Sequence, residues 1–197
     1  MDVDGIYLAS ASPRRAALLD QIGVEYQVIA PEIGEDPLAG EAAEATVVRL
    51  ASEKAECVAR QTRAAPRPVL AADTLVVLAG EVMGKPRDEA AALAMLGKLS
   101  GQTHQVLTGV ALAWAGTLQT RLNVSEVRFR STTLQECRAY CLTGEPMGKA
   151  GAYAVQGMGA VFIERISGSY SGVMGLPLKQ TAELLSATGQ PAWLGAR

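Results

Sequence analysis

The pair Asp73-Thr74 is the first candidate for chemistry, because a carboxylate and a hydroxyl lie inside an otherwise apolar stretch, between residues 69–72 and 75–78. A carboxylate in such surroundings costs desolvation free energy unless a positive group meets it. A divalent cation, a lysine or a water to be deprotonated would each offset that cost. A turn in which Asp73 accepts backbone hydrogen bonds is the structural alternative.

The second candidate is the segment SASPRR at residues 10–15, where a predicted strand gives way to a predicted helix. The N–H groups at a helix N-terminus carry partial positive charge and suit phosphate. Ser10 and Ser12 add hydroxyl groups, and Arg14 and Arg15 add guanidinium groups. Arginines in a first helical turn oppose the helix dipole, so their presence favours an anionic ligand. Solvated arginines on an ordinary first turn are the alternative.

Further charged residues lie in settings that could serve the same ligand. Lys85 and Lys149 lie close to glycines, which would let them approach a polyphosphate closely. Lys54 lies on a predicted helix, where a lysine is more commonly solvated. Glu35 and Asp36, in a loop rich in proline and glycine, could bring a second carboxylate, although surface loops are often acidic.

Several standard nucleotide-binding patterns are missing from the sequence. It contains neither a phosphate-binding loop of the G-x-x-x-x-G-K-[ST] type nor a dinucleotide-binding G-x-G-x-x-G after a strand. Aromatic residues make up only 5% of the chain, too few for a platform on which single-stranded nucleic acid would stack. A phosphate site would therefore have to be built from several separate elements.

Composition excludes other classes. The chain has 197 residues, 18 Lys+Arg and 20 Asp+Glu, so its formal net charge of −2 gives no general attraction to nucleic acid or to an anionic membrane. His104 is the single histidine, so a Ser-His-Asp hydrolase would require it as the base. Cys137, Cys141 and His104 could in principle supply three zinc ligands, but the lack of a C-x-x-C pair favours buried thiols.

The location of the protein is predicted from its cysteines and from two absences. Three widely spaced cysteines, an odd number, fit a reducing compartment. Residues 1–5 are acidic and lack the order of a signal peptide, and no apolar run approaches the ~20 residues needed to span a bilayer. We therefore expect a cytoplasmic protein with no membrane partner.

The elements that must position these residues follow from periodicity and capping signals. Single strands and hairpins alternate with helices, which predicts an α/β class with a mixed sheet. Irregular segments are expected at 31–40, 144–159 and 167–172. Helices are predicted over 13–22, 41–63, 89–99 (capped by Asp88), 134–141 (capped by Thr133) and 177–187, and strands over 6–9, 24–30, 69–72, 75–78, 81–83, 105–114, 118–129 and 160–166.

Seven short motifs, taken in order, resemble the Maf family. They are SxSPRR at 10–15, EKA at 53–55, ADT at 72–74, GKP at 84–86, SG at 100–101, KAGAY at 149–153 and GLP at 175–177. The resemblance covers residues 6–185, nearly the whole chain.

The resemblance implies a fold and an activity. Maf proteins are nucleoside triphosphate pyrophosphatases that cleave between the α and β phosphates. They have an elongated α/β fold with a mixed, twisted sheet and two lobes around a central cleft, similar to inosine triphosphatases, which would make residues 1–197 a single Maf-like domain. They require a divalent cation (Mg²⁺ or Mn²⁺) and are usually homodimers.

The resemblance also assigns roles to residues of this chain. Arg14, Thr74 and Gln156 match the branch that prefers dTTP and UTP and differ from the 7-methyl-GTP branch. Asp73 matches the catalytic base, which would deprotonate water or help to hold the metal. Glu35 matches a loop carboxylate and a metal-binding position shared with Asp73, although the family often has an acidic pair where this chain has Gly34-Glu35. The positions that match the phosphate site are Ser10, Arg15, Lys54 and Lys85.

Two other functions fit the same motifs. One is a nucleotide-binding regulator of septum formation that works through a partner without important turnover. The other is removal of modified pyrimidine triphosphates, with dTTP and UTP as substitutes. The retention of Asp73 beside Lys54 and Lys85 favours an active enzyme, because a regulator has no need of a base within a cationic cage.

Overall fold

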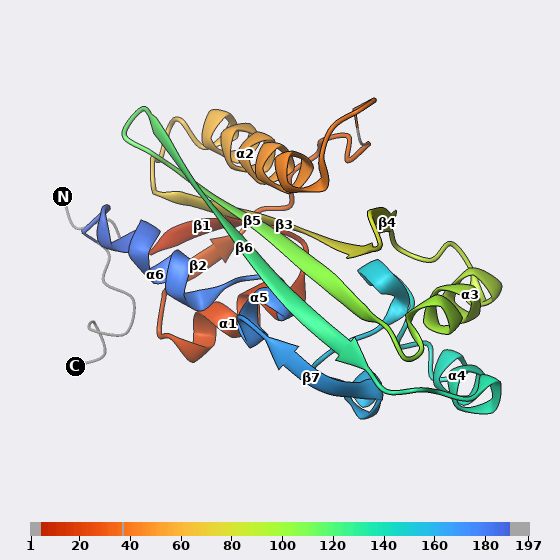
Figure 1. Cartoon of the computed structure of the whole chain (residues 1–197). Helices are drawn as coiled ribbons and strands as arrows, with labels where there is room; N and C mark the ends of the chain where they lie inside the picture. Colours follow the sequence, from red (N-terminus) through yellow and green to blue (C-terminus); the bar gives the residue numbers. More distant parts are fainter. Residues whose placement is uncertain (1–4, 37, 190–197) are drawn as a thin grey trace. The chain divides into compact units, whose positions relative to one another are not determined.

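The computed structural model describes residues 5–36 and 38–189 and contains one seven-stranded sheet (Figure 1). The strand order is β2-β1-β3-β5-β6-β7, and β4 pairs with β3. β1 is parallel to β2 and β3, whereas the β3–β4 and β6–β7 pairs are antiparallel. The predicted α/β class with a mixed sheet is therefore confirmed. The strands are β1 (Ile6–Ala9), β2 (Tyr26–Val28), β3 (Val69–Leu78), β4 (Glu81–Met83), β5 (Thr103–Trp114), β6 (Thr117–Phe129) and β7 (Ile163–Ser167).

The helices begin largely where the capping signals place them. The Asp88 carboxylate accepts the Ala91 N–H at 2.7 Å, and Thr133 and Glu136 form a reciprocal capping box. The α-helices are α1 (Pro13–Gln21), α2 (Ala43–Gln61), α3 (Glu89–Leu99), α4 (Leu134–Cys141), α5 (Tyr170–Met174) and α6 (Leu178–Ser186); two 3₁₀ helices cover Ala150–Ala152 and Met158–Phe162.

β3 is one continuous strand through Asp73-Thr74, so the turn considered as the structural alternative at Asp73 does not form. Two predictions about elements were wrong. Residues 160–162 belong to a 3₁₀ turn that buries Phe162, so β7 begins at Ile163. The segment 167–172 was predicted as a loop, but α5 begins within it because the Ser169 hydroxyl accepts the Gly172 N–H and its carbonyl accepts the Val173 N–H.

The described residues group into two compact units. The first draws on residues 5–36, 38–73, 108–123 and 175–189, and the second on Thr74–Leu107 and Val124–Met174. β3, β5 and β6 each contribute residues to both units. The acidic residues 1–4, part of the signal-peptide argument, lie outside the described residues.

The core of the first unit lies between α2 and the sheet. Ala51, Ala55 and Val58 of α2 pack against alternate residues of the strands. Because side chains alternate along a strand, Ile6 and Leu8 of β1 point to the opposite face, where α1 and α6 lie (Figure 1). The strand residues that meet α2 are Tyr7, Ala9, Val69, Ala71 and Ala111.

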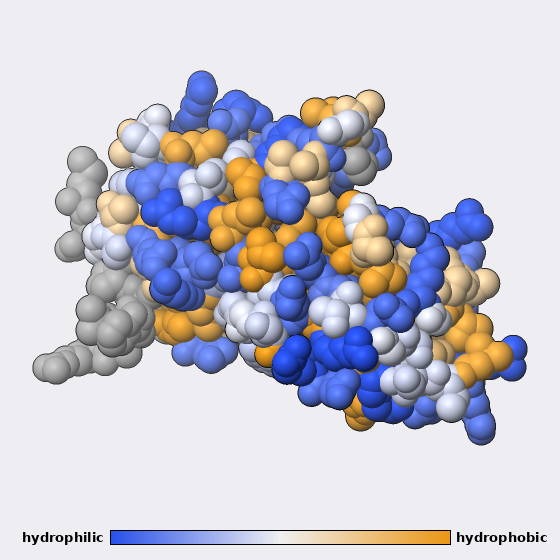
Figure 2. All heavy atoms as spheres, viewed as in Figure 1, coloured by the Kyte–Doolittle hydropathy of each residue, from blue (hydrophilic) through white to orange (hydrophobic). Residues whose placement is uncertain are grey.

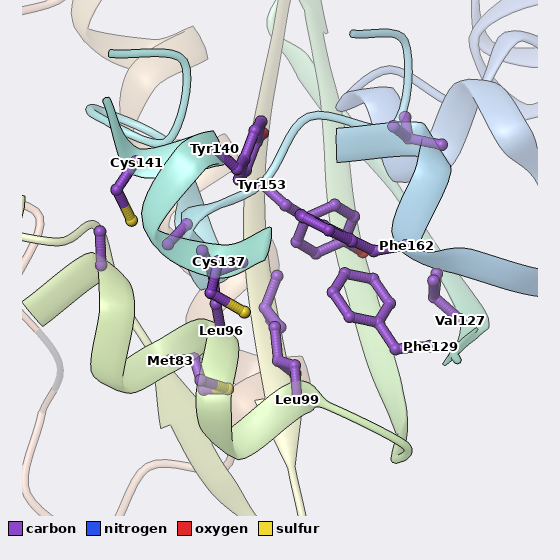
Figure 3. Close-up of a cluster of buried hydrophobic side chains, with 14 of the residues drawn as sticks. Met83, Leu96, Leu99, Val127, Phe129, Cys137, Tyr140, Cys141, Tyr153 and Phe162 are labelled. Atoms are coloured by element: carbon purple, nitrogen blue, oxygen red, sulfur yellow. The ribbon is translucent and has the colours of Figure 1, made fainter. Parts of the chain in front are cut away.

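The core of the second unit is built around aromatic rings. Phe129 contacts the ring of Tyr153 edge-on with centroids 4.9 Å apart, and Tyr140 contacts Phe162 in the same way at 5.2 Å. Figure 3 shows these rings beside α3 and α4, with Leu96, Leu99 and Cys137 among their neighbours. This core holds α4 and the irregular segment that follows it.

The surface of Figure 2 shows hydrophobic atoms gathered over the middle of β6. The large apolar side chains of β6 that remain exposed are Leu118, Leu122 and Val124. In the described part of the chain, no helix is both long and apolar enough to cross a membrane.

Gly109 is where α2 approaches β5 most closely. A Cβ atom on Gly109 would lie 2.3 Å from the carbonyl oxygen of Val47, a backbone atom that cannot rotate away. We expect Gly109→Ala to destabilise the protein by about 1–3 kcal/mol, because α2 would have to shift. Urea unfolding measures the change. Gly97→Ala is the control, since nothing lies within 4 Å of that Cβ position on α3. Equal stability of the two variants would contradict this packing.

His104 is a buried, neutral side chain that contacts Tyr153. Its Nε2 lies 2.8 Å from the Tyr153 hydroxyl, and it is 2% exposed. Among the described residues, Nδ1 has no hydrogen-bond partner, and no group of three or more His, Cys, Asp or Glu side chains is placed to hold a metal ion. Cys137 and Cys141 are buried free thiols, as the sequence favoured.

Burial lowers the pKa of His104 from its ordinary value of 6.5 to about 4. Between these values the unfolded chain binds a proton that the folded protein excludes, so stability falls as the pH is lowered from 6.5 towards 4. We expect His104 to account for about 3 kcal/mol of this loss. Unfolding free energies of His104→Gln and the wild type, measured at pH 7 and pH 4, test this. An equal pH dependence in both proteins would contradict it.

Candidate active site

Lys54 is the centre of a charged cluster in the first unit. Its ammonium nitrogen lies 2.6 Å from Asp73 Oδ1 and 2.5 Å from Glu35 Oε1. The side chains of Lys54 and Asp73 are 7% and 10% exposed, whereas Glu35 is 46% exposed. Of the groups that could offset the desolvation cost of Asp73, the structure therefore provides a lysine.

The sequence brings these residues together through two periodicities. Lys54 lies on the buried face of α2, beside Ala51, Ala55 and Val58. Residues 69 and 71 of β3 face α2, so strand alternation places Asp73 on the same face as Lys54. The expectation that Lys54 is solvated on its helix was wrong, because this face of α2 packs on the sheet.

The loop that carries Glu35 is attached to α2 by Arg49. The Arg49 Nη2 donates to the Asp36 carbonyl at 3.3 Å and to Glu41 Oε2 at 2.7 Å. The hydrogen bond from Arg49, with others from Thr46 and Leu38, lowers the pKa of Glu41 to about 2. Glu41 is thus ionised at neutral pH, and Arg49 stabilises the loop from which Glu35 reaches Lys54.

The segment 10–15 forms the basic side of the cluster. Ser10 Oγ accepts hydrogen bonds from the Ser12 N–H and from Arg15 Nη1, both at 3.1 Å. Arg15 Nε donates to the Gly175 carbonyl at 2.8 Å, which links the SPRR and GLP motifs. Ser10 therefore orients Arg15, and its hydroxyl proton is still a donor.

Burial and neighbouring charges shift the pKa of Arg15. Burial lowers its pKa, the Asp73 and Glu35 carboxylates act in the opposite direction, and Arg14 adds to the lowering. Burial lowers the pKa of Arg14 as well. Both guanidinium groups stay protonated, so two fixed positive charges lie partly withheld from water, and that of Arg15 lies near Asp73 and Glu35.

The other predicted site residues belong to the second unit. Thr74 is half-buried and follows Asp73 directly in β3, while Lys85 and Gln156 are exposed. The Gly84 carbonyl accepts the Gly151 N–H at 3.1 Å, so the loop that carries Lys85 is bonded to the glycine-rich segment. A Cβ on Gly151 would lie 3.1 Å from the Val76 side chain, which brings this segment against β3.

Glu35 and Asp73 are the oxygen donors available for a divalent cation in this cluster. Mg²⁺ in proteins is commonly held by one or two carboxylates and completed by substrate phosphates and water. Lys54 already brings these two carboxylates within reach of one atom. The donor set therefore fits a hard cation that arrives with a phosphate ligand.

Two groups of residues that bond to segments carrying predicted site residues were not found from the sequence. Arg49 shows no motif, since its i+4 partner Glu53 suggests only a surface ion pair. Tyr140 and Glu145 lie outside the matched motifs, yet they bond to the segment that contains Gln156. The only signal was the Glu145-Pro146 pair at the start of a segment with many glycines.

Comparison with known proteins places the chain in a family. The family model described as Maf-like protein matches residues 5–188. A dTTP/UTP pyrophosphatase of Aromatoleum aromaticum is 50% identical over 198 residues, covering 94% of this chain and 96% of that protein. Proteins of the same description from Shigella dysenteriae and Escherichia coli O157:H7 are each 52% identical over 181 residues, covering 92% of this chain and 91% of theirs. Residues 5–188 include every residue of the candidate site, and the chain belongs to the family of Maf-like proteins.

Proposed function

We propose that this protein is a nucleoside triphosphate pyrophosphatase that converts dTTP and UTP to the monophosphate and pyrophosphate. The observation that carries the proposal is the buried Lys54–Asp73 ion pair, with Glu35 and Arg15 beside it. The names of the relatives, which are about half identical over most of the chain, support the choice of substrate.

The charges of the cluster suit this reaction. Water adds to the α phosphorus, the bond from that phosphorus to the oxygen that bridges it to the β phosphorus breaks, and pyrophosphate leaves with the electron pair. Negative charge grows on the leaving group as the bond breaks. Fixed cations that face this charge stabilise the transition state more than the ground state. Arg14, Arg15 and Lys54 are the cations of the first unit that would serve this purpose, and Lys85 that of the second.

Asp73 is the proton acceptor in this proposal. Lys54 donates to its Oδ1, and we assign the proton of the attacking water to the other carboxylate oxygen. Glu35 and Asp73 are the residues that would hold Mg²⁺ or Mn²⁺. A bound cation would neutralise phosphate charge and increase the acidity of water.

The products of hydrolysis test the proposal. Incubation with dTTP, UTP, dCTP and GTP in the presence of Mg²⁺, then of Mn²⁺, is expected to release pyrophosphate and monophosphate from dTTP and UTP. Release of orthophosphate would contradict cleavage between the α and β phosphates. Tight nucleotide binding without any product would favour the regulator of septum formation.

Thr74 and Gln156 are proposed to read the base by hydrogen bonds to a pyrimidine edge. A site built to bond a polar edge rejects an analogue that leaves its groups unpaired. We expect Thr74→Val with Gln156→Ala to reduce the preference for dTTP over dCTP by at least about tenfold, measured as the ratio of kcat/KM values. An unchanged ratio would place base recognition elsewhere.

A homodimer and a cytoplasmic location belong to the same proposal. The exposed apolar side chains of β6 support self-association, since apolar patches on soluble proteins commonly mark contact surfaces. The three free cysteines support a reducing compartment. Light scattering after gel filtration is expected to give twice the monomer mass, and a monomer at micromolar concentration would contradict the dimer.

A further inference from the structure

A hydrogen-bonded network in the second unit surrounds the segment that contains Gln156. Tyr140, at the end of α4, donates its hydroxyl proton to Glu145 Oε1 at 2.7 Å. The same hydroxyl accepts the Ala154 N–H at 3.1 Å. The Glu145 carboxylate accepts the N–H groups of Met158 and Gly159, each at 3.0 Å. Two side chains therefore hold three backbone amides of one short segment.

Gln156 lies between the amides that this network holds. Its neighbours Ala154 and Val155 are 4% and 6% exposed, whereas Gln156 itself is exposed. On the other side, Gly159 is buried and bonded to Glu145. The backbone is thus fixed before and after an exposed amide side chain, which is the arrangement that a side chain reading a ligand requires.

The glycines beside Gln156 make room for the network. A Cβ on Gly157 would lie 2.3 Å from Glu145 Oε2, and a Cβ on Gly159 would lie 2.7 Å from the Tyr140 hydroxyl oxygen. Neither glycine has a positive φ, so conformational freedom does not explain them. The two glycines are explained instead by the space that the Glu145 and Tyr140 side chains need.

The network is charged as well as close-fitting. Burial would raise the pKa of Glu145, but the hydrogen bonds from Gly159, Tyr140 and Met158 outweigh it and lower the pKa. The carboxylate is therefore ionised at neutral pH and acts purely as an acceptor. All three of these partners donate to it, and hydrogen bonds to an ionised group are stronger than neutral ones.

We propose that Glu145 and Tyr140 are positioning residues that determine base specificity by holding the segment on which Gln156 is presented. The inference rests on the proposed function of Gln156. Neither residue touches the substrate in this proposal. Their loss would leave Gln156 present but free to take other orientations, so discrimination would fall more than turnover.

The test uses Glu145→Gln, Tyr140→Phe and Gly157→Ala in the full chain, because each disturbs the network differently. The first removes the charge, the second removes the hydroxyl, and the third displaces an intact Glu145. We expect each to reduce the ratio of kcat/KM for dTTP over dCTP by about tenfold, mainly by raising KM for dTTP. If one variant does not fold, the other two still decide the outcome.

Glu136→Gln is the matched control for a merely structural role. Glu136 lies on α4, the helix that also carries Tyr140, and accepts hydrogen bonds from Arg130 and from the Thr133 N–H, both at 2.7 Å. We expect this variant to lose thermal stability with its substrate ratio unchanged. If the network variants lose only stability in the same way, the proposal is overturned.

Gln156→Ala separates failure of the inference from failure of the proposed function. In a protein that already carries Gln156→Ala, Glu145→Gln should have no further effect on the ratio of kcat/KM for dTTP over dCTP, because both changes act through one side chain. Additive effects, or a ratio that changes with Glu145→Gln but not with Gln156→Ala, would overturn the inference. A wild-type protein that releases no pyrophosphate contradicts the proposed function alone. In that case, the Kd values for α,β-methylene dTTP and α,β-methylene dCTP are measured, and their ratio replaces the ratio of kcat/KM values in comparing the variants.

Discussion

Asp73→Asn is expected to reduce kcat for dTTP by about a thousandfold or more, while nucleotide affinity changes by less than about tenfold. Asparagine has the size and shape of aspartate, and its amide oxygen can still accept the hydrogen bond from Lys54. It cannot accept a proton from water. The variant therefore removes the proposed chemistry and retains the packing of a side chain that is only 10% exposed.

Turnover is measured by pyrophosphate release and affinity by calorimetry with α,β-methylene dTTP. Asp88→Asn is the control, because it makes the same chemical change at an exposed helix cap. We expect that control to retain wild-type kcat. Near-normal turnover in Asp73→Asn would remove Asp73 from the reaction and leave the charged cluster without its proposed base.

Local chemistry explains why several elements were predictable. The Asp88 cap and the Thr133 capping box each depend on residues within three positions along the chain. The hairpin turns at 79–80 and 115–116 likewise have positive φ at both residues, as a type I′ turn requires. Periodicity does not show which of several polar residues belong to one site. The order of the motifs along the chain indicated that grouping.

Long-range contacts explain what was not predictable. The course of β3 through Asp73 depends on Lys54, which lies 19 residues earlier and is brought close only when α2 packs on the sheet. The contact of Glu35 with Lys54 depends on the loop that Arg49 attaches to α2. The residues next to Asp73 in the sequence include neither Lys54 nor Glu35. The sequence alone therefore allowed four interpretations of Asp73: contact with a divalent cation, with a lysine or with a water to be deprotonated, or a turn.

The average charge shows the same limit. A net charge of −2 indicates no attraction to polyanions. Yet the first unit gathers Arg15 and Lys54 beside two carboxylates, with Arg14 close to Arg15. Segregation of charge within a fold, which composition cannot report, suits one small polyanion accompanied by a cation.

Lys54→Met is expected to lower both stability and turnover, because Asp73 would lose the cation that contacts it. Breaking a buried ion pair by removing one partner costs about 3–5 kcal/mol, since the other charge stays buried without compensation. Urea unfolding measures this loss. Turnover of dTTP is expected to fall at least about a hundredfold, because the base and the phosphate site lose a shared anchor.

Lys98→Met provides the comparison for Lys54→Met. Lys98 lies 2.8 Å from Glu81 Oε1, nearly the same separation, but the two side chains are 53% and 66% exposed. An exposed pair contributes about 0–1 kcal/mol, so this variant should unfold almost like the wild type. The difference in unfolding free energy between Lys54→Met and Lys98→Met would then report the effect of burying an ion pair rather than the effect of having one.

The double variant Lys54→Met, Asp73→Asn separates the two roles of Lys54. If the stability loss comes from an uncompensated Asp73 charge, neutralising Asp73 should recover most of it, with a coupling free energy of about 1–3 kcal/mol. Turnover should not recover, because Asp73→Asn has removed the proton acceptor. Additive stability losses would mean that Lys54 stabilises the fold through its contacts along α2 or with Glu35, and the pair with Asp73 would then be retained for chemistry alone.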